Sequence, residues 1–248
     1  MKAIQLSSIS TRAPKSLNKE KTKAKTAAIL EELDELQNLL YAENKHSILI
    51  VIQGMDASGK DGAIRNVFGK LNPQGVRVHS FKAPSSLEQS HDFLWRVHSV
   101  APQKGMIQIF NRSHYEDVLI TRVHRLCTDE LAKKRMRAIA DFERLLMEHN
   151  NTHILKFYLH VSPEEQQKRL QERIHLPNKQ WKYNERDFEE AKLWNLYMKM
   201  YEDVFKTCNQ PPWTITPSDQ NWYKEYIIAT QLRDTLIQLN MQYPGLKK

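Results

Sequence analysis

The sequence predicts an α/β protein built on a parallel sheet. Continuous apolar runs such as Ile48–Ile52 show no polar alternation, which is typical of strands covered by helices on both faces. Segments with apolar residues at three- and four-residue steps lie between these runs, and strands that alternate with helices form βαβ units. We therefore expect parallel strands joined by crossover helices, with no internal repeat and no linker to a second domain.

The first half of the chain supplies three of the expected strands. Residues 26–43 carry Ile and Leu along one stripe opposite an acidic face, the pattern of an amphipathic helix. A turn at Asn72–Gly75 and a capping box of Ser85 and Glu88 set further boundaries. The expected elements are a helix over 26–43, a strand over 48–52, a helix over 60–70, a strand over 76–81, a short helix after Ser85 and a strand over 106–110.

The second half continues the alternation. Ser162 is a predicted N-cap, with Pro163 at the first helical position and Glu165 three residues after the cap. Pro177 ends that helix. The helix over 129–149 is expected to turn Leu131, Ile139, Phe142, Leu145 and Leu146 inward. The remaining elements are a strand over 154–161, a helix from Pro163, a long helix from after Asn184 to about Cys208, a strand over 213–216 and a helix over 222–240.

Composition excludes several classes of protein. The 248 residues include 5 Trp, 9 Tyr and 8 Phe, too many for a disordered chain, and only 7 Gly and 10 Pro, too few for a collagen or a low-complexity linker. The sequence has no apolar run near the length of a membrane span and no apolar stretch of a secretory signal near its start. We expect a cytoplasmic protein in which Cys127 and Cys208 are free thiols.

The net charge of +8 suggests an acidic partner, such as nucleic acid, an anionic membrane or a phosphorylated small molecule. The positive charge is concentrated near the N-terminus, because residues 1–25 contain seven cations and one acid. The net charge is therefore weak evidence about the partner of the remaining residues. We expect this segment to be a basic, solvated and mobile arm. Residues 26–248 then form a single domain that is nearly neutral.

The junction between the first strand and the next helix matches G-x-x-x-x-G-K over Gly54–Lys60. Glycines let consecutive N–H groups face one anion, the helix N-terminus adds positive potential, and Lys60 reaches β/γ-type phosphates. Asp61 stands where such loops usually have the Ser or Thr that helps to hold Mg²⁺. Asp56 is a candidate Mg²⁺ ligand or acceptor-activating base. The predicted phosphate-binding residues are Gly54, Ala57, Ser58, Gly59, Lys60, Asp61 and Gly62.

Charged residues follow the strand over 106–110, in Asn111–Asp117 and at Arg122. Acidic residues at the carboxyl end of this strand would face the loop and complete a metal site, so Asp117 joins Asp56 as a candidate ligand. Arg112 and Arg122 would stabilise the charge of a transferring phosphate. A charged surface loop is an equal alternative for this segment taken alone.

A third basic segment, 173–182, joins two predicted helices before the last strand and contains Arg173, Lys179 and Lys182. It suits a lid that closes over phosphates, and the alternative is a solvated hairpin tip. Trp181 within it could stack on a nucleobase or pack against the lid.

These three motifs in this order resemble the family-2 polyphosphate kinases. The matching stretches are 53–68, 109–124, 171–204 and 211–236, and the likeness extends over about 25–240. It implies a three-layer α/β/α P-loop kinase fold with a parallel sheet and a helical lid over about 162–208. It implies a homodimer or homotetramer that transfers phosphate between inorganic polyphosphate and a nucleotide with Mg²⁺, or Mn²⁺ in its place.

The resemblance also assigns roles to single residues. The catalytic set is Asp56, Lys60, Arg112, Glu116 and Arg122; the lid adds Arg173, Lys179 and Lys182 to polyphosphate binding; and nucleotide binding falls to Asn111, Arg112, Glu116 and Asp117. The diphosphate-specific subgroup has a neutral Asn where this chain has Glu116. This favours AMP as acceptor, with ADP and ATP as later products and guanine nucleotides as further substrates.

Two other classes share parts of this pattern. An ATP-dependent nucleotide kinase would have the same loop and lid, and a nucleic-acid-binding protein would explain the charge. We expect neither a nucleic acid nor a membrane as partner. The basic run over 133–137 is a solvated helix face or, alternatively, a polyphosphate track. The ten histidines show no spacing typical of a metal site.

Overall fold

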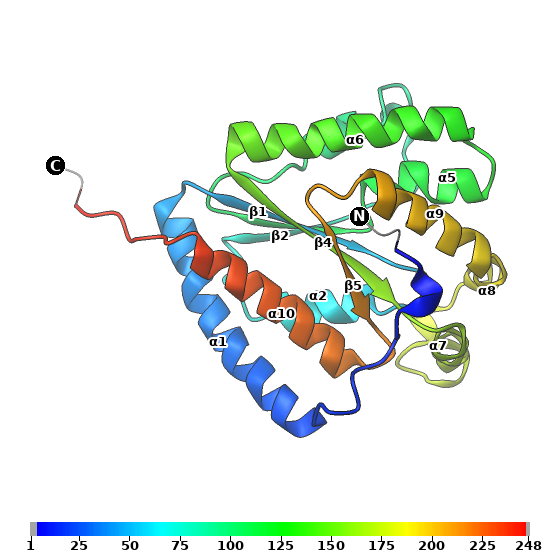
Figure 1. The fold of residues 1–248 in the computed structure, drawn as a ribbon, viewed down its shortest axis with the longest axis horizontal. Helices are drawn as coiled ribbons and strands as arrows, with labels where there is room; N and C mark the ends of the chain where they lie inside the picture. Colours follow the sequence, from blue (N-terminus) through cyan, green and yellow to red (C-terminus); the bar gives the residue numbers. More distant parts are fainter. Residues whose placement is uncertain (1–3, 247–248) are drawn as a thin grey trace.

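A five-stranded parallel sheet forms the centre of the computed structural model, which describes residues 4–246 (Figure 1). Its strands lie in the order β2-β3-β1-β4-β5, and every neighbouring pair is parallel. The predicted parallel sheet is therefore confirmed. The strands are β1 (Ser47–Gln53), β2 (Val76–Ser80), β3 (Ile107–Asn111), β4 (Thr152–His160) and β5 (Trp213–Pro217).

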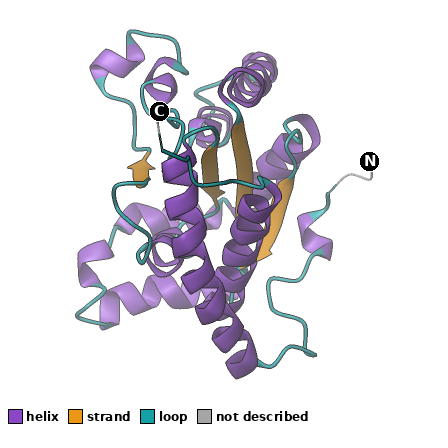
Figure 2. Ribbon diagram, turned by 90° about the vertical axis from the view of Figure 1, so that its left-hand side faces the viewer, coloured by secondary structure: helices purple, strands orange, loops and turns teal. Residues whose placement is uncertain are grey.

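Helices cover both faces of this sheet and complete three layers (Figures 1 and 2). One layer contains α1, α2 and α10; the other contains α5, α6 and α9, while α7 and α8 lie beyond the carboxyl ends of the strands. The helices are α1 (Lys19–Glu43), α2 (Lys60–Phe68), α3 (Ser86–Gln89), α4 (Trp95–His98), α5 (Ile120–Val123), α6 (Asp129–Asn150), α7 (Pro163–His175), α8 (Glu185–Lys192), α9 (Trp194–Thr207) and α10 (Asn221–Gln238), with 3-10 turns η1 (Leu6–Ser8), η2 (His114–Val118) and η3 (Gln180–Lys182).

The central strand β1 explains the two cores. All seven of its residues are buried. Successive side chains of a strand point to opposite faces, so Ile48, Ile50 and Ile52 pack in the core under α1 and α10. Leu49 and Val51 pack in the core under α6 and α9. A continuous apolar run is thus what a central strand of a three-layer sheet requires.

The predicted mobile arm over 1–25 is wrong for the residues that the structure describes. Residues 19–25 are the first turns of α1, whose N-cap is Asn18. Ahead of them the chain lies against the domain, and Leu6 is only 1% exposed. Its N–H donates to Glu202 at 2.8 Å, and the Thr11 hydroxyl donates to Asp219 at 2.8 Å. The charge of this segment gave no sign that it packs against the domain, because one buried leucine and a few hydrogen bonds hold it there.

Two further expectations need correction. The long helix predicted from Asn184 to about Cys208 is two helices, because the backbone leaves helical geometry at Leu193 between α8 and α9. In α6, Leu131 and Leu145 are 42% and 46% exposed. The buried stripe of α6 passes one position away from both leucines, through Ala132, Met136, Ile139, Phe142, Glu143 and Leu146.

Several local predictions are confirmed. Ser162 caps α7 by accepting from the Glu165 N–H, with Pro163 in its first turn. Ser85 and Glu88 form the expected capping box. Cys127 and Cys208 are buried free thiols. None of the helices in the described part is both long and apolar enough to cross a membrane.

We predict that Leu6→Ala lowers the free energy of unfolding by about 2–4 kcal/mol, because it removes a fully buried leucine from the core. Chemical denaturation followed by circular dichroism measures this. The neighbouring Ser7→Ala, at an exposed position, is the control and should change stability by less than about 0.5 kcal/mol. A Leu6 variant as stable as this control would show that the segment does not pack in solution.

Candidate active site

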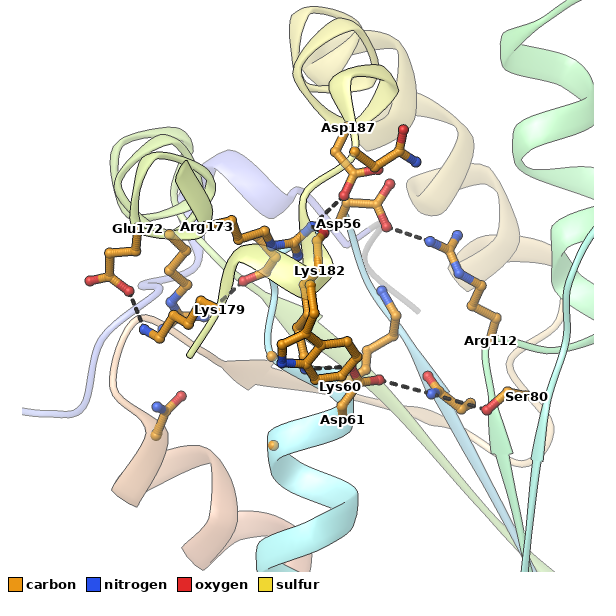
Figure 3. Close-up of a pocket in the computed structure, with 18 of the residues that line it drawn as sticks. Asp56, Lys60, Asp61, Ser80, Arg112, Glu172, Arg173, Lys179, Lys182 and Asp187 are labelled. Carbon is orange, nitrogen blue, oxygen red and sulfur yellow. Dashed lines mark hydrogen bonds and ion pairs between the residues drawn. The ribbon is translucent and has the colours of Figure 1, made fainter. Parts of the chain in front are cut away.

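The carboxyl ends of the parallel strands form one edge, where ligands bind in open α/β sheets. The loop over 54–59 leaves β1 there and leads into α2 at Lys60. A cavity of about 890 Å³ lies between this loop, the ends of β2 and β3, and the α7–α8 hairpin. Figure 3 shows side chains of the loop and of the hairpin around the same space. We call this space the loop pocket.

Lys60 lies beneath the loop. Its Nζ donates to the carbonyl oxygens of Gly54 at 2.8 Å and Met55 at 3.1 Å. Burial and the positive charge of Arg112 lower the pKa of Lys60 to about 8, although Asp56 and Glu116 oppose this shift. A bound polyanion would favour the charged form of this lysine, which suits a phosphate ligand.

Asp56, Arg112 and Glu116 form one charged cluster above Lys60. The Arg112 guanidinium donates to Asp56 and lies 3.6 Å from Glu116 Oε2. Against the effect of burial, the charges of Arg112, Lys60 and Arg173 hold the pKa of Asp56 below its usual value. Burial raises the pKa of Glu116 despite the nearby cations. Asp56 is therefore the firmly ionised carboxylate of the pair.

Gln53 at the end of β1 fixes the orientation of Glu116. In the amide orientation of Gln53 that satisfies both of its ends, the nitrogen donates to Glu116 Oε1 at 3.0 Å, and the oxygen accepts from the Ser113 N–H at 3.1 Å. Gln53 is not among the site residues predicted from the sequence. It could have been found, because it is a glutamine at the end of a fully buried strand, and a buried amide needs hydrogen-bond partners.

The α7–α8 hairpin brings the three predicted lid cations to the loop pocket (Figure 3). Each is paired with a carboxylate: Arg173 with Asp187, Lys179 with Glu172 at 2.5 Å, and Lys182 with Asp61 at 2.9 Å. The last pair joins the hairpin to the first turn of α2. Asn111 also donates to Asp61, at 3.1 Å.

The structure does not bring Arg122 and Asp117 into the loop pocket. Arg122 pairs with Asp129 at 2.8 Å and Asp203 at 2.9 Å, which ties α5 to α6 and α9. Asp117 pairs with Arg96 at 3.2 Å, and burial raises its pKa. Arg122 was expected to stabilise the charge of the transferring phosphate, and Asp117 was expected to bind a metal ion. Both roles stay predictions, and the geometry does not support either.

A second cavity of about 1090 Å³ adjoins the first, and we call it the apolar pocket. Asp56 and Arg112 line both pockets, as do Phe81, Lys82, Asn184 and Asp187. Glu116 and Asp117 line only the second one. The part of its wall that the loop pocket does not share is partly apolar, with contributions from Ala83, Pro84, Phe93, Ile120 and Leu126.

Two cations that the sequence analysis missed touch the loop. Arg169 of α7 donates to the carbonyl oxygens of Ala57 and Ser58, and Lys224 of α10 donates to that of Gly59. Lys224 could have been found. It lies on the buried stripe of α10, one helical turn before Ile228, and a lysine in phase with buried residues needs a special partner.

The residues at the pocket junction fit a magnesium ion. In the described part of the chain, three or more His, Cys, Asp or Glu side chains do not gather in a metal-binding group. Mg²⁺ uses one or two protein carboxylates and completes its octahedral shell with water and phosphate oxygens. Asp56, held ionised at the wall of both pockets, offers such a ligand.

Comparison with known proteins decides the family. The family model of polyphosphate kinase 2 (PPK2) matches residues 16–244. The chain belongs to the polyphosphate kinase 2 family. The match begins at residue 16, so it extends further into the N-terminal segment than the expected start near residue 25.

Individual relatives agree with the PPK2 assignment. An AMP/ADP-polyphosphate phosphotransferase of Meiothermus ruber is 48% identical over 220 residues, which cover 88% of this chain and 82% of the relative. An ADP-polyphosphate phosphotransferase of Rhodopseudomonas palustris is 42% identical over 87% of this chain and 79% of its own. The crystal structure of polyphosphate kinase 2 from Arthrobacter aurescens TC1 superposes with a TM-score of 0.96 at 37% identity, covering 100% of this chain and 90% of that one.

These findings confirm the predicted fold and enzyme class. The chain is a P-loop-type α/β kinase of the PPK2 family and a polyphosphate:nucleotide phosphotransferase. The family assignment favours this class over the ATP-dependent nucleotide kinases and the nucleic-acid-binding proteins that the loop and the charge alone left open.

We predict that Lys60→Ala abolishes phosphoryl transfer and leaves the fold intact, because it removes a buried charge from beneath the phosphate loop. Steady-state assays and thermal denaturation test the two halves of this prediction. Arg65→Ala, an exposed cation on the same helix, is the control and should keep full activity. An active Lys60 variant would contradict the assignment of the loop.

Proposed function

We propose that this polyphosphate kinase moves the terminal phosphoryl group of inorganic polyphosphate to AMP, and then to ADP, with Mg²⁺ bound at Asp56. The observation that carries the proposal is the meeting of two different pockets at Asp56 and Arg112. One pocket suits a chain of phosphates, and the other suits a nucleoside.

The loop pocket is assigned to the polyphosphate donor. Polyphosphate has no base or sugar, so charge, backbone N–H groups and metal must recognise it. Cations reach this pocket from the loop, from the end of β2 and from the lid: Lys60, Lys82, Arg112, Arg169, Arg173, Lys179 and Lys182. Their carboxylate partners, such as Asp61 and Asp187, would exchange for phosphate oxygens when the donor binds.

The apolar pocket is assigned to the acceptor nucleotide. Phe93 and Leu126 offer apolar surface to a purine. Arg112 at the junction would hold the phosphate of AMP next to the donor. Glu116 then lies beside that phosphate, and its carboxylate would disfavour the extra negative charge of a diphosphate. This is the physical basis for expecting AMP to be accepted.

The chemistry is an in-line displacement at the terminal phosphorus of polyphosphate. A phosphate oxygen of the acceptor forms the new P–O bond, and the bond to the penultimate phosphate breaks, with its electron pair leaving on the shortened chain. An ionised phosphate oxygen needs no base, so positioning and charge neutralisation carry the catalysis. Lys60 and Arg112 supply protein charge, and the Mg²⁺ held by Asp56 would neutralise further phosphate charge.

Three expectations go beyond these pockets and stay predictions. They are the use of guanine nucleotides, Mn²⁺ as a substitute for Mg²⁺, and assembly into a homodimer or homotetramer. The choice between a nucleobase and lid packing for Trp181 is also open. Trp181 is 77% exposed at the wall of the loop pocket, with Lys182 Nζ 4.8 Å from the centroid of its ring.

A donor comparison tests the proposed function. With AMP and Mg²⁺, we expect polyphosphate to produce ADP first and ATP later, as separated by chromatography. ATP as donor should produce ADP far more slowly, and chelation of Mg²⁺ should stop both reactions. Faster ADP formation with ATP than with polyphosphate would contradict the proposal.

We predict that Glu116→Asn lowers the ratio of kcat/KM for AMP to kcat/KM for ADP by about tenfold, or about 1.4 kcal/mol. The variant removes the carboxylate that disfavours a second phosphate near Arg112. Glu148→Gln, an exposed carboxylate on α6, is the control. An equal loss for both acceptors would show that Glu116 does not discriminate between them.

A further inference from the structure

Side chains hold the carbonyl groups of the phosphate loop in place. Each carbonyl oxygen of residues 54–59 accepts from a side chain. The donors are Lys60 to Gly54 and Met55, Gln166 to Asp56 at 2.9 Å, Arg169 to Ala57 and Ser58 at 3.1 Å each, and Lys224 to Gly59 at 3.2 Å. The C=O and N–H of a peptide unit point in opposite directions, so this arrangement keeps acceptors away from an incoming phosphate.

Arg169 ties the lid to this loop. Its guanidinium also donates to the carbonyl oxygens of Ser218 at 2.7 Å and Asp219 at 3.0 Å, and its Nε donates to Glu165 at 2.8 Å. One side chain thus spans the first lid helix, the phosphate loop and the segment between β5 and α10. The planar fork of an arginine can make these bonds together, whereas a lysine cannot.

Lys224 is a buried cation directly behind Gly59. It is 0% exposed, and its Nζ also contacts Asn221 Oδ1 at 3.0 Å and Ser58 O at 3.5 Å. Gly59 has a φ of +94°, and a Cβ there would lie 2.3 Å from Nζ. Only a glycine therefore permits this contact.

The charge of Lys224 lacks a local carboxylate partner. Among the ion pairs of the described residues, none includes Lys224, and its contacts are two carbonyls and an amide. Burial, with the positive charges of Arg169 and Lys60, lowers its pKa to about 7, while Glu225 and Glu165 oppose this shift. A buried cation without a counter-ion destabilises a fold, and an anion on the loop would supply that counter-ion.

We propose that Arg169 and Lys224 are positioning residues for the polyphosphate donor. They hold the loop carbonyls in place, and the bound phosphate compensates the charge of Lys224. This inference rests on the assignment of the donor to the loop pocket, and it does not depend on which nucleotide is the acceptor.

The alternative is that Lys224 only supports the fold, and Lys224→Met separates the two roles. In this variant Ser58 O keeps Arg169 as donor, and Gly59 O keeps the Ala63 N–H at 3.0 Å. Neither carbonyl is then left without a donor, so only the bonds of Lys224 itself are lost. If these bonds support the fold, their loss should lower the melting temperature. The positioning role predicts a melting temperature equal to or above that of the wild type, because an uncompensated buried charge is removed.

We expect Lys224→Met to raise the KM for polyphosphate roughly 10- to 100-fold, the effect of losing one charge-assisted interaction, with the KM for AMP nearly unchanged. Arg233→Met removes a cation from the same helix far from the loop, and it should leave both KM values unchanged. In the wild type, kcat/KM for polyphosphate should fall as pH rises through about 7 and again near 8, as Lys224 and then Lys60 lose their protons. The first fall should disappear in Lys224→Met.

Arg169→Lys provides the second variant. It keeps the charge but cannot bridge all three segments, so we expect a higher KM for polyphosphate and a smaller change for AMP. A Lys224→Met protein that fails to fold, or that has a wild-type KM and pH profile for polyphosphate, would overturn the proposal. A rise in KM for AMP alone would instead show that the donor and acceptor pockets are exchanged, which is a failure of the proposed function.

Discussion

The parallel pairing of β1 with β3 is the interaction on which the site depends. Ile52 pairs with Asn111 at the ends of the two strands, and the Arg112 N–H still donates to Ile52 O at 3.0 Å. This register sets the phosphate loop beside the segment that carries Arg112 and Glu116. Because β1 is buried along its whole length, a slip of one residue would exchange the side chains that pack into the two cores. The position of the catalytic cluster is therefore fixed by the core.

The site balances its charge internally. Arg112 lies against Asp56, Arg173 against Asp187, and Lys182 against Asp61. These pairs let many cations gather in one cavity without mutual repulsion, and phosphate oxygens can take the place of the carboxylates. This explains why the net charge was a poor guide to the partner. A large part of the +8 belongs to residues 1–25, while the cations at the site are compensated by neighbouring acids.

The sequence predicted the loop, the lid and their order well, because each follows a short motif with a fixed physical role. It could not assign single side chains within Asn111–Asp117. Residues 114–118 form a 3-10 turn, in which successive side chains point about 120° apart, so Glu116 faces Arg112 while Asp117 faces Arg96. The packing of Leu6 depends on contacts with residues about 200 positions away, which no local pattern reveals.

The central claim is that phosphate donor and nucleotide acceptor occupy separate pockets that meet at Asp56 and Arg112. A crystal structure with AMP, Mg²⁺ and a short methylene-bridged polyphosphate analogue that cannot transfer its phosphate tests this most directly. We expect the analogue to lie along the loop over 54–60, the AMP phosphate at Arg112 and the base against Phe93. AMP with its phosphate on the loop, and the analogue beside Phe93, would contradict it.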